Sequence, residues 1–338
     1  MATHDNLQAK HDTVRVAVVA IEGCLTVAVA GLVDVFAVAN KWEKARTGRS
    51  ERRFEIRVLS AEPNGVRSFT GYPMPADGPL DSWAGGDIVI CSAVANDPVR
   101  SVQRNPELVA WLAAQARVPD QQLASVCTGA FFLAEAGLLD GHRATTNPLF
   151  GDAFAKRYPA VKLELSRVVV DEGGVVTAGT VSAGLNLALH LVERHSGVEV
   201  AAITAKALAV DKNRETQVPY LIPTLRLDAG DELAVRTQRL IEARHSEPDL
   251  SLETLAAALS VAPRTLQRRF HSATGDSPIT YLRLVRLEAA KRLLETTDGS
   301  IDSITWDVGY RDSRSFSRLF RANTTLTPSG YRARFGTR

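Results

Sequence analysis

Two stretches near the carboxyl terminus repeat one pattern, LETLAAALSVAPRTLQRRFHSATGDSPITY at residues 252–281 and IDSITWDVGYRDSRSFSRLFRANTTLTPSGY at residues 301–331. Their second halves align at an offset of 50, which pairs Phe270 with Phe320 and Tyr281 with Tyr331. Their first halves align at 49, so one residue is inserted in the turn between them. Each copy has the apolar spacing of a short helix, a turn and a second helix. The repeat therefore predicts two helix-turn-helix motifs in an all-α domain.

The polar face of the second helix in each copy carries side chains that suit a DNA major groove. Arginine pairs bidentately with guanine and glutamine with adenine, and a good pair discriminates between bases by about 1–3 kcal/mol. One such face would be typical of a solvated helical bundle, but two at one repeat favour binding to double-stranded DNA. Arg332 is a candidate phosphate contact. The candidate base-reading residues are Arg264, Gln267, Arg268, Ser313, Arg314, Ser317 and Arg318.

Residues 233–336 resemble the DNA-binding domain of the AraC/XylS family, through both repeats and the helical stretch between them, YLRLVRLEAAKRLL. The resemblance implies that a rigid helix from about Pro278 to Leu294 holds two readers in successive major grooves, roughly 34 Å apart. The sequence departs from the family at Ala262, where a capping serine is usual, and at Trp306, where a small residue is usual. It departs again at 323–325, where a Thr-Gly pair is common.

Composition is that of an ordinary globular protein, with 338 residues, 45% hydrophobic and 23% charged. The length predicts two domains. The formal net charge of +2 is unevenly distributed. Residues 230–338 hold 17 Lys/Arg and 13 Asp/Glu, a net charge of about +4. The rest of the chain holds 40 − 17 = 23 Lys/Arg and 38 − 13 = 25 Asp/Glu, a net charge of about −2. This excess alone supports DNA binding weakly, so the argument depends on where the arginines lie.

The first two hundred residues alternate short β-branched runs with helical patterns. The run VRVAVVAI is followed by a helical stretch, then by FEIRVLSA, GGDIVICSA, another helix and QLASV. This alternation predicts a flavodoxin-like α/β sandwich with a mostly parallel sheet. We expect this domain at residues 12–210, a linker at 211–230 that contains Pro219 and Pro223, and the DNA-binding domain at 231–338.

Cys127 lies between the strand pattern QLASV and a helix, which is the arrangement of a nucleophile elbow. A helix amino terminus there would lower the pKa of the thiol and present the sulfur at a pocket. Alternatively, Cys127 is a small buried residue in a tight turn. The residues leave both interpretations open.

Residues 14–210 resemble the ThiJ/PfpI branch of the class I glutamine amidotransferase-like superfamily, as it occurs fused to AraC-type domains in GlxA-like regulators. The stretches LVDVFAVAN, SVCTGAFFLAEAGLLDG, RATTNP and VVTAGTVSAGLNLALHLVER carry the resemblance. Enzymes of this family place a histidine where this chain has Asn147, and an acidic residue where it has Ala28. Neither residue can activate a thiol, so the resemblance implies a domain that is not an enzyme.

The same resemblance implies an effector pocket near the cysteine, with the segment around Gly23 and Leu25 as another wall. The candidate ligand-binding residues are Ser92, Ala93, Cys127, Thr128 and Asn147. We expect a homodimeric regulator, an activator, that responds to a small nitrogenous metabolite. The alternatives are a thiol-dependent amidase or glyoxalase-like enzyme with an attached DNA-binding domain, and a redox sensor based on Cys127.

Three widely spaced cysteines and the lack of any metal-ligand spacing predict neither a metal site nor another cofactor. The amino-terminal stretch MATHDNLQAKHD lacks the apolar core of a signal peptide. Charged residues and glycines interrupt the most apolar run, residues 16–39, which argues against a membrane span. We therefore expect a cytoplasmic protein with no membrane partner.

Overall fold

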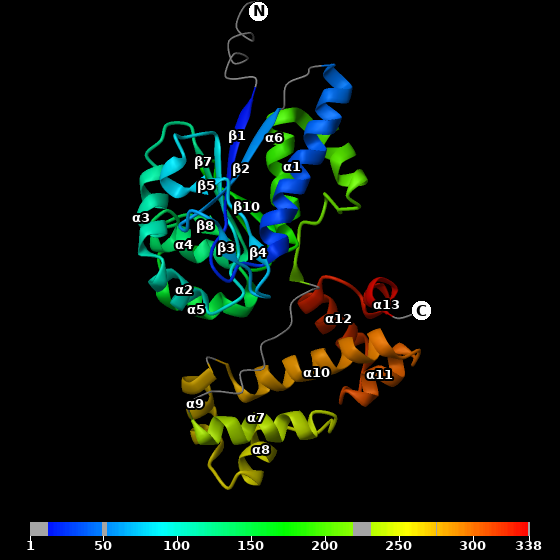
Figure 1. The fold of residues 1–338 in the computed structure, drawn as a ribbon. Coiled ribbons are helices and arrows are strands. Elements are labelled where there is room, and N and C mark those ends of the chain that lie inside the picture. The colour runs from blue at the N-terminus through cyan, green and yellow to red at the C-terminus, as the bar shows by residue number, and fades with distance from the viewer. Residues whose placement is uncertain (1–12, 49–52, 219–230, 275, 337–338) are drawn as a thin grey trace, which may run out of the picture. The chain divides into compact units, whose positions relative to one another are not determined.

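The computed structural model describes residues 13–48, 53–218, 231–274 and 276–336 (Figure 1). It divides into two compact units, Met1–Gln217 and Val218–Arg338. The predicted end of the first domain, at residue 210, falls short of this boundary. The Gln217 side chain is buried and donates from Nε2 to the carbonyl oxygen of Leu165 at 2.7 Å, which holds residues 211–217 on the first unit. The remainder of the predicted linker, residues 219–230 with both prolines, lies outside the described residues.

The first unit is built on a seven-stranded sheet in the order β10-β11-β7-β6-β1-β2-β5. All neighbours run parallel except β10, which is antiparallel to β11. Central strands such as β6 are apolar and buried at every position, as expected for a parallel sheet with both faces covered. The strands are β1 (Val14–Val19), β2 (Phe54–Ser60), β5 (Gly78–Pro79), β6 (Ile88–Cys91), β7 (Gln122–Val126), β10 (Val169–Asp171) and β11 (Val175–Ala178). Two smaller sheets pair β3 (Val66–Arg67) with β4 (Pro73–Met74) and β8 (Arg143–Ala144) with β9 (Lys162–Leu163).

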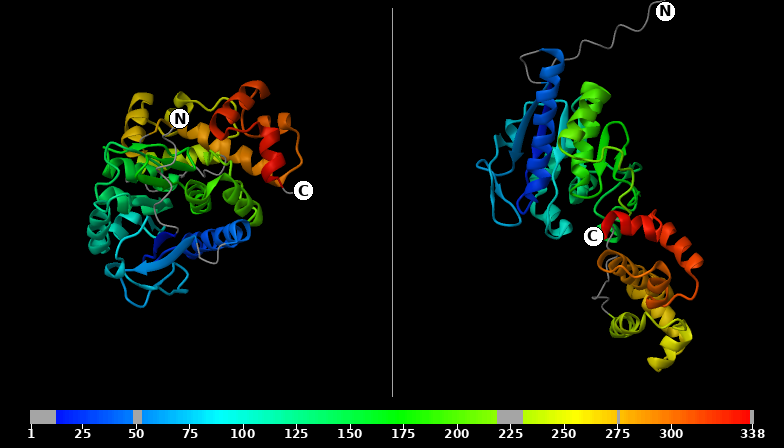
Figure 2. Two further views of the ribbon diagram at one scale, coloured as in Figure 1. Left: turned by 90° about the horizontal axis from the view of Figure 1, so that it is seen from above. Right: turned by 90° about the vertical axis from the view of Figure 1, so that its right-hand side faces the viewer.

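Helices cover both faces of the large sheet. The long helices α1 (Thr26–Thr47) and α6 (Ala183–Ala207) pack side by side on one face, as Figures 1 and 2 show. The other face is covered by α2 (Pro98–Arg104), α3 (Pro106–Gln115), α4 (Ala130–Glu135) and α5 (Gly151–Arg157). The predicted flavodoxin-like α/β fold is confirmed.

In the described residues of the second unit, all regular secondary structure is helical. Its helices are α7 (Glu232–Arg244), α8 (Leu252–Ala258), α9 (Pro263–Thr274), α10 (Pro278–Thr296), α11 (Ile301–Asp307), α12 (Ser313–Thr324) and α13 (Pro328–Phe335). The pairs α8–α9 and α11–α12 are the two predicted helix-turn-helix motifs. The long helix between them, α10, contributes Tyr281 and Leu282 to the core of the first copy and Leu287 and Leu294 to that of the second.

The two copies have equivalent hydrogen bonds as well as equivalent apolar cores. Tyr281 Oη donates to Glu242 Oε1 at 2.7 Å, and its equivalent, Tyr331 Oη, donates to Glu295 Oε1 at 2.8 Å. Glu242 lies on α7 and Glu295 on α10. Thus α10 is the last helix of the first copy and also the first helix of the second. In the second copy it takes the position that α7 has in the first.

Positive φ angles recur at equivalent points of the repeat. Ser260 (φ 56°) and Gly309 (φ 88°), separated by the offset of 49, shape the turns between the paired helices. Thr325 (φ 64°) ends α12 in the left-handed conformation, where the first copy has Gly275 in its sequence. The unusual residue at 325 thus occupies a position that favours glycine.

Candidate nucleic-acid interface and effector pocket

The outer face of α9 is polar and exposed. Leu266 and Phe270 are fully buried in the core of the first copy. The three predicted base-reading residues of this helix, Arg264, Gln267 and Arg268, are all exposed. Their neighbour Arg269 is also exposed, but its guanidinium pairs with Asp231 at 2.8 Å and ties α9 to the start of α7.

The corresponding face of α12 is less uniform. Arg314 and Arg318 are exposed, whereas Ser313 and Ser317 are half-buried. The Ser313 hydroxyl donates to the Asp302 carboxylate on α11, so this serine braces the motif. Five of the seven candidate side chains are therefore exposed, and four of these five are arginines.

Arg332, the candidate phosphate contact, also bonds within the domain. It is half-buried, and its guanidinium donates to the carbonyl oxygen of Gly299 in the loop that precedes α11. This contact holds α13 against the second motif. Arg332 therefore has a packing role within the domain, and its phosphate contact stays a prediction.

The predicted elbow at Cys127 is present. Cys127 has φ 57° and connects β7 to a short 3-10 helix, η2 (Cys127–Gly129), which continues into α4. The Thr128 hydroxyl donates to the Val94 carbonyl at 2.8 Å and accepts from its amide at 2.9 Å. These bonds join the elbow to the loop after β6.

This loop belongs to the topological switch point of the sheet. The chain leaves β1 toward β2 on one side, while β6 and β7 lie on the other. Leu25 N donates to Ala93 O at 3.1 Å, which brings the loop after β1 to the same edge. Ligands of open α/β sheets bind at such a point, outside the carboxyl ends of the strands.

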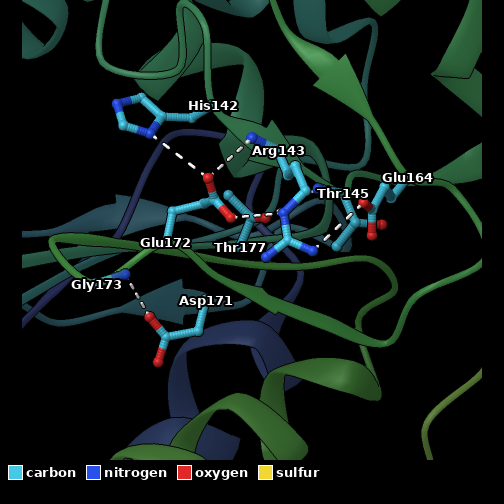
Figure 3. A network of polar contacts seen from close by, with 8 residues as sticks. All are labelled: His142, Arg143, Thr145, Glu164, Asp171, Glu172, Gly173 and Thr177. Carbon is cyan, nitrogen blue, oxygen red and sulfur yellow. Dashed lines mark hydrogen bonds and ion pairs between the residues drawn. The ribbon is translucent and has the colours of Figure 1, made fainter.

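The segment that carries Asn147 is held by polar contacts with β11 and with the turn between β10 and β11 (Figure 3). Arg143 Nε donates to Glu172 Oε1 at 2.7 Å, and Thr145 N donates to Thr177 Oγ1 at 2.9 Å. Next to them, Thr146 Oγ1 donates to Cys127 O at 2.8 Å. The network thus places the RATTNP segment against the elbow.

Burial dominates the chemistry of the elbow thiol. Cys127 is 1% exposed, and burial raises the pKa of its thiol to about 11, although Thr128 and Asn147 side chains act to lower this pKa. The predicted lowering of the pKa by a helix amino terminus is wrong, because desolvation of the thiolate outweighs the hydrogen bonds around it.

The candidate ligand-binding residues lie together but are mostly covered. Ser92 and Ala93 are fully buried, Thr128 is 1% exposed and Asn147 is half-buried. Ser92 Oγ is buried without a hydrogen-bond partner. Ala28, the residue aligned with the acidic residue of the enzymes, lies in the first turn of α1 and is buried in the core. The geometry offers a buried cluster of small and polar side chains rather than an exposed nucleophile.

The native chain is expected to resist alkylation at Cys127. Iodoacetamide reacts with the thiolate, which is scarce at pH 8 when the pKa is about 11. Peptide mapping should show rapid modification of Cys127 only after unfolding, and faster native modification toward pH 11. Because the pKa is raised from about 8.5, the neutral thiol favours the fold fully below about pH 8.5, and this contribution disappears as the pH rises through 11. Rapid native labelling at pH 7 would contradict this assignment.

In the described part of the chain, no group of three His, Cys, Asp or Glu side chains could hold a metal ion. Across the same ranges, no helix is both long enough and apolar enough to span a membrane.

Comparisons with known proteins match both units. A model of the DJ-1/PfpI family matches residues 14–194, and a model described as a helix-turn-helix domain matches residues 255–334. The chain is 31% identical over 281 residues to the HTH-type transcriptional regulator CdhR of Pseudomonas aeruginosa, covering 82% of this chain and 81% of the relative. It is 36% identical over 133 residues, 39% of each chain, to the transcriptional activator NphR of a Rhodococcus species.

A solved structure has the same fold over much of the chain. The crystal structure of an AraC family transcriptional regulator from Pseudomonas putida matches with a TM-score of 0.50 and 21% identity, over 58% of this chain and 99% of that one. Together with the two helix-turn-helix motifs and the elbow, these matches identify the protein as a member of the AraC-type, DNA-binding transcription regulators that carry a DJ-1/PfpI domain.

Proposed function

We propose that this regulator activates transcription by reading two successive major grooves with α9 and α12, in response to a small nitrogenous metabolite. The observation that supports the DNA-reading part is the pair of exposed arginine-bearing faces at equivalent positions of the repeat. The activator role is supported by the similarity to NphR, whose name describes a transcriptional activator. Binding as a homodimer, with one double reader from each subunit, belongs to the same proposal.

Arg268→Ala and Arg318→Ala should each weaken binding to the specific operator by about 1–3 kcal/mol and relax base preference at one position. Each removes an exposed guanidinium from one recognition helix without altering the core. Arg269→Ala is the matched control, because that side chain is engaged with Asp231. The measurement is footprinting at fixed salt against competing random DNA. Unchanged footprints in both recognition-helix variants would refute the assignment.

The effector is proposed to bind at the switch point, against Ser92, Ala93, Cys127, Thr128 and Asn147. The support is the position of these residues at the edge where open α/β sheets bind ligands, together with the unpartnered buried hydroxyl of Ser92. Amino acids and quaternary amines should be screened by thermal shift on the full chain. A hit should raise the Tm of the wild type and fail to raise that of Asn147→Ala, which removes the one half-buried side chain of the set; equal shifts would place the effector elsewhere.

The first unit is proposed to lack catalysis. A buried thiol with a pKa of about 11, beside Asn147 and Ala28 in place of a base and an acid, supports effector recognition over an amidase, a glyoxalase-like enzyme or a redox sensor. The full chain should show no turnover of amides or 2-oxoaldehydes, and promoter activation by the effector should be the same under reducing and oxidising conditions. Turnover that disappears in Cys127→Ser would overturn this part of the proposal and leave the DNA-reading part standing.

A further inference from the structure

The two helix-turn-helix copies are joined by more than the helix they share. Arg286 lies on α10, between the residues of this helix that enter the first core and those that enter the second. Although it is an arginine, it is only 7% exposed. Its Nε donates to His245 O at 2.7 Å and its Nη2 donates to Glu247 O at 2.6 Å. Both carbonyls belong to the loop after α7, in the first copy.

The same guanidinium meets the turn of the second motif. Its Cζ lies 5.2 Å from the centre of the Tyr310 ring, within the range of a cation–π contact. The α carbon of Gly309 is so close that a β carbon there would lie 2.7 Å from His245 O and 2.9 Å from Arg286 Nη2. The backbone of the second turn therefore packs directly on the loop of the first copy.

An ion pair at the surface makes a third link between the same two segments. Arg311, in the turn before α12, pairs with Asp249, in the loop before α8, at 2.6 Å. Both side chains are largely exposed, so the pair contributes little to stability by itself. It shows, however, that the loop and the turn stay adjacent out to the surface.

We propose that these contacts form a clasp that sets the position of α12 relative to α9, and so the spacing of the two DNA grooves that the domain accepts, with Arg286 as the positioning residue. The clasp consists of His245, Glu247, Asp249, Arg286, Gly309 and Arg311. These contacts connect the two recognition helices through few elements. Helix α9 packs on α7, which is followed by the loop, and the turn that contacts the loop is followed directly by α12.

The need for a clasp follows from the geometry of α10. In Figure 1 this helix runs along the whole second unit and carries one copy near each end. A shared helix fixes the distance between the copies, while bending and side-chain repacking still allow each copy to turn about it. Two linked readers gain affinity only to the extent that binding one presents the other correctly. A lateral contact between loop and turn supplies this alignment.

The test compares two DNA duplexes with the full-length chain. The first is a duplex selected by the wild type from random-sequence DNA, and the second has base pairs inserted between the two footprinted segments. We expect Arg286→Met to lower affinity for the selected duplex about ten- to hundredfold and to leave affinity for the spaced duplex nearly unchanged, because alignment and not contact is lost. Arg292→Met, at an exposed position of the same helix, should preserve the preference.

A second variant, at the surface, tests the proposal even if Arg286→Met misfolds. Asp249→Asn leaves the core untouched and should reduce the ratio of the two affinities about threefold, whatever its general effect on DNA binding. If both variants keep the wild-type ratio, or if Arg286→Met lowers both affinities by one factor while remaining folded, the clasp does not set the spacing. This inference rests on DNA reading by the second unit; a wild type that selects no duplex would contradict that function, whereas an unchanged ratio would contradict only the clasp.

Discussion

Gly129→Ala is expected to lower the free energy of unfolding of the first unit by about 3 kcal/mol. A β carbon at this position would lie 2.5 Å from Cys91 O and 2.8 Å from Ser92 O. Both are backbone atoms at the end of the central strand β6, where Ser92 N is bonded to Val19 O, so neither can move without disturbing the sheet. The elbow and the loop after β6 can approach each other only because residue 129 has no side chain.

Chemical unfolding of the full chain, followed by probes for each unit, would measure this effect. The two units are separate bodies, so two transitions are expected, and only that of the first unit should shift. Gly174→Ala is the matched control, because a β carbon at Gly174 meets nothing within 4 Å. That variant should stay within about 0.5 kcal/mol of the wild type. Equal stability of the two variants would show that the elbow does not need this close approach.

The second unit was largely predictable because its pattern is local. The apolar positions of a helix recur within one or two turns, and the repeat doubles the signal, so Leu266 and Phe270 indicated the buried face of α9 directly. Pro263 is the first residue of that helix, where the missing N–H of proline costs nothing. The same argument placed Arg268 and Arg318 on the exposed faces.

The chemistry of Cys127 was not predictable in the same way. The sequence shows a strand, a cysteine and a helix, which suggests a thiol exposed at a helix amino terminus. Its burial depends on segments far along the chain, among them Thr146, whose hydroxyl bonds to the cysteine carbonyl, and the loop at Val94. Since burial controls the pKa here, the choice between an exposed thiol and a buried turn residue needed the tertiary structure, which favours the buried residue.

Arg286 and Arg332 escaped prediction for a related reason. Both stand near other charged residues in the sequence, where an exposed position is the usual outcome for an arginine. Each is instead held by backbone carbonyls, which leave no mark in the sequence: the partners of Arg286 lie 41 and 39 residues away. A long cationic side chain can thus join segments of any composition, provided that their carbonyls face it.

The turns of the two copies show whether backbone strain or close contact accounts for glycine at position 309. Ser260 and Gly309 occupy equivalent positions with φ of 56° and 88°, so a residue with a β carbon can adopt the left-handed conformation in this kind of turn. The first turn, accordingly, tolerates serine. What distinguishes the second turn is the close approach of His245 O and the guanidinium of Arg286. Contact, more than backbone strain, therefore explains glycine at position 309.

Gly309→Ala should consequently destabilise the second unit by about 3 kcal/mol, of which strain accounts for about 1 kcal/mol and displacement of the buried carbonyl and guanidinium for the rest. Thermal or chemical unfolding of the full chain, followed by a probe in the second unit, would measure the loss. Gly299→Ala is the matched control, since a β carbon there meets its neighbours at ordinary distances of 3.6 Å and 3.7 Å. A loss limited to about 1 kcal/mol would mean that strain alone acts and that the turn and the loop can separate at little cost. A larger loss, confined to Gly309→Ala, would show that the two copies are packed against each other at this point.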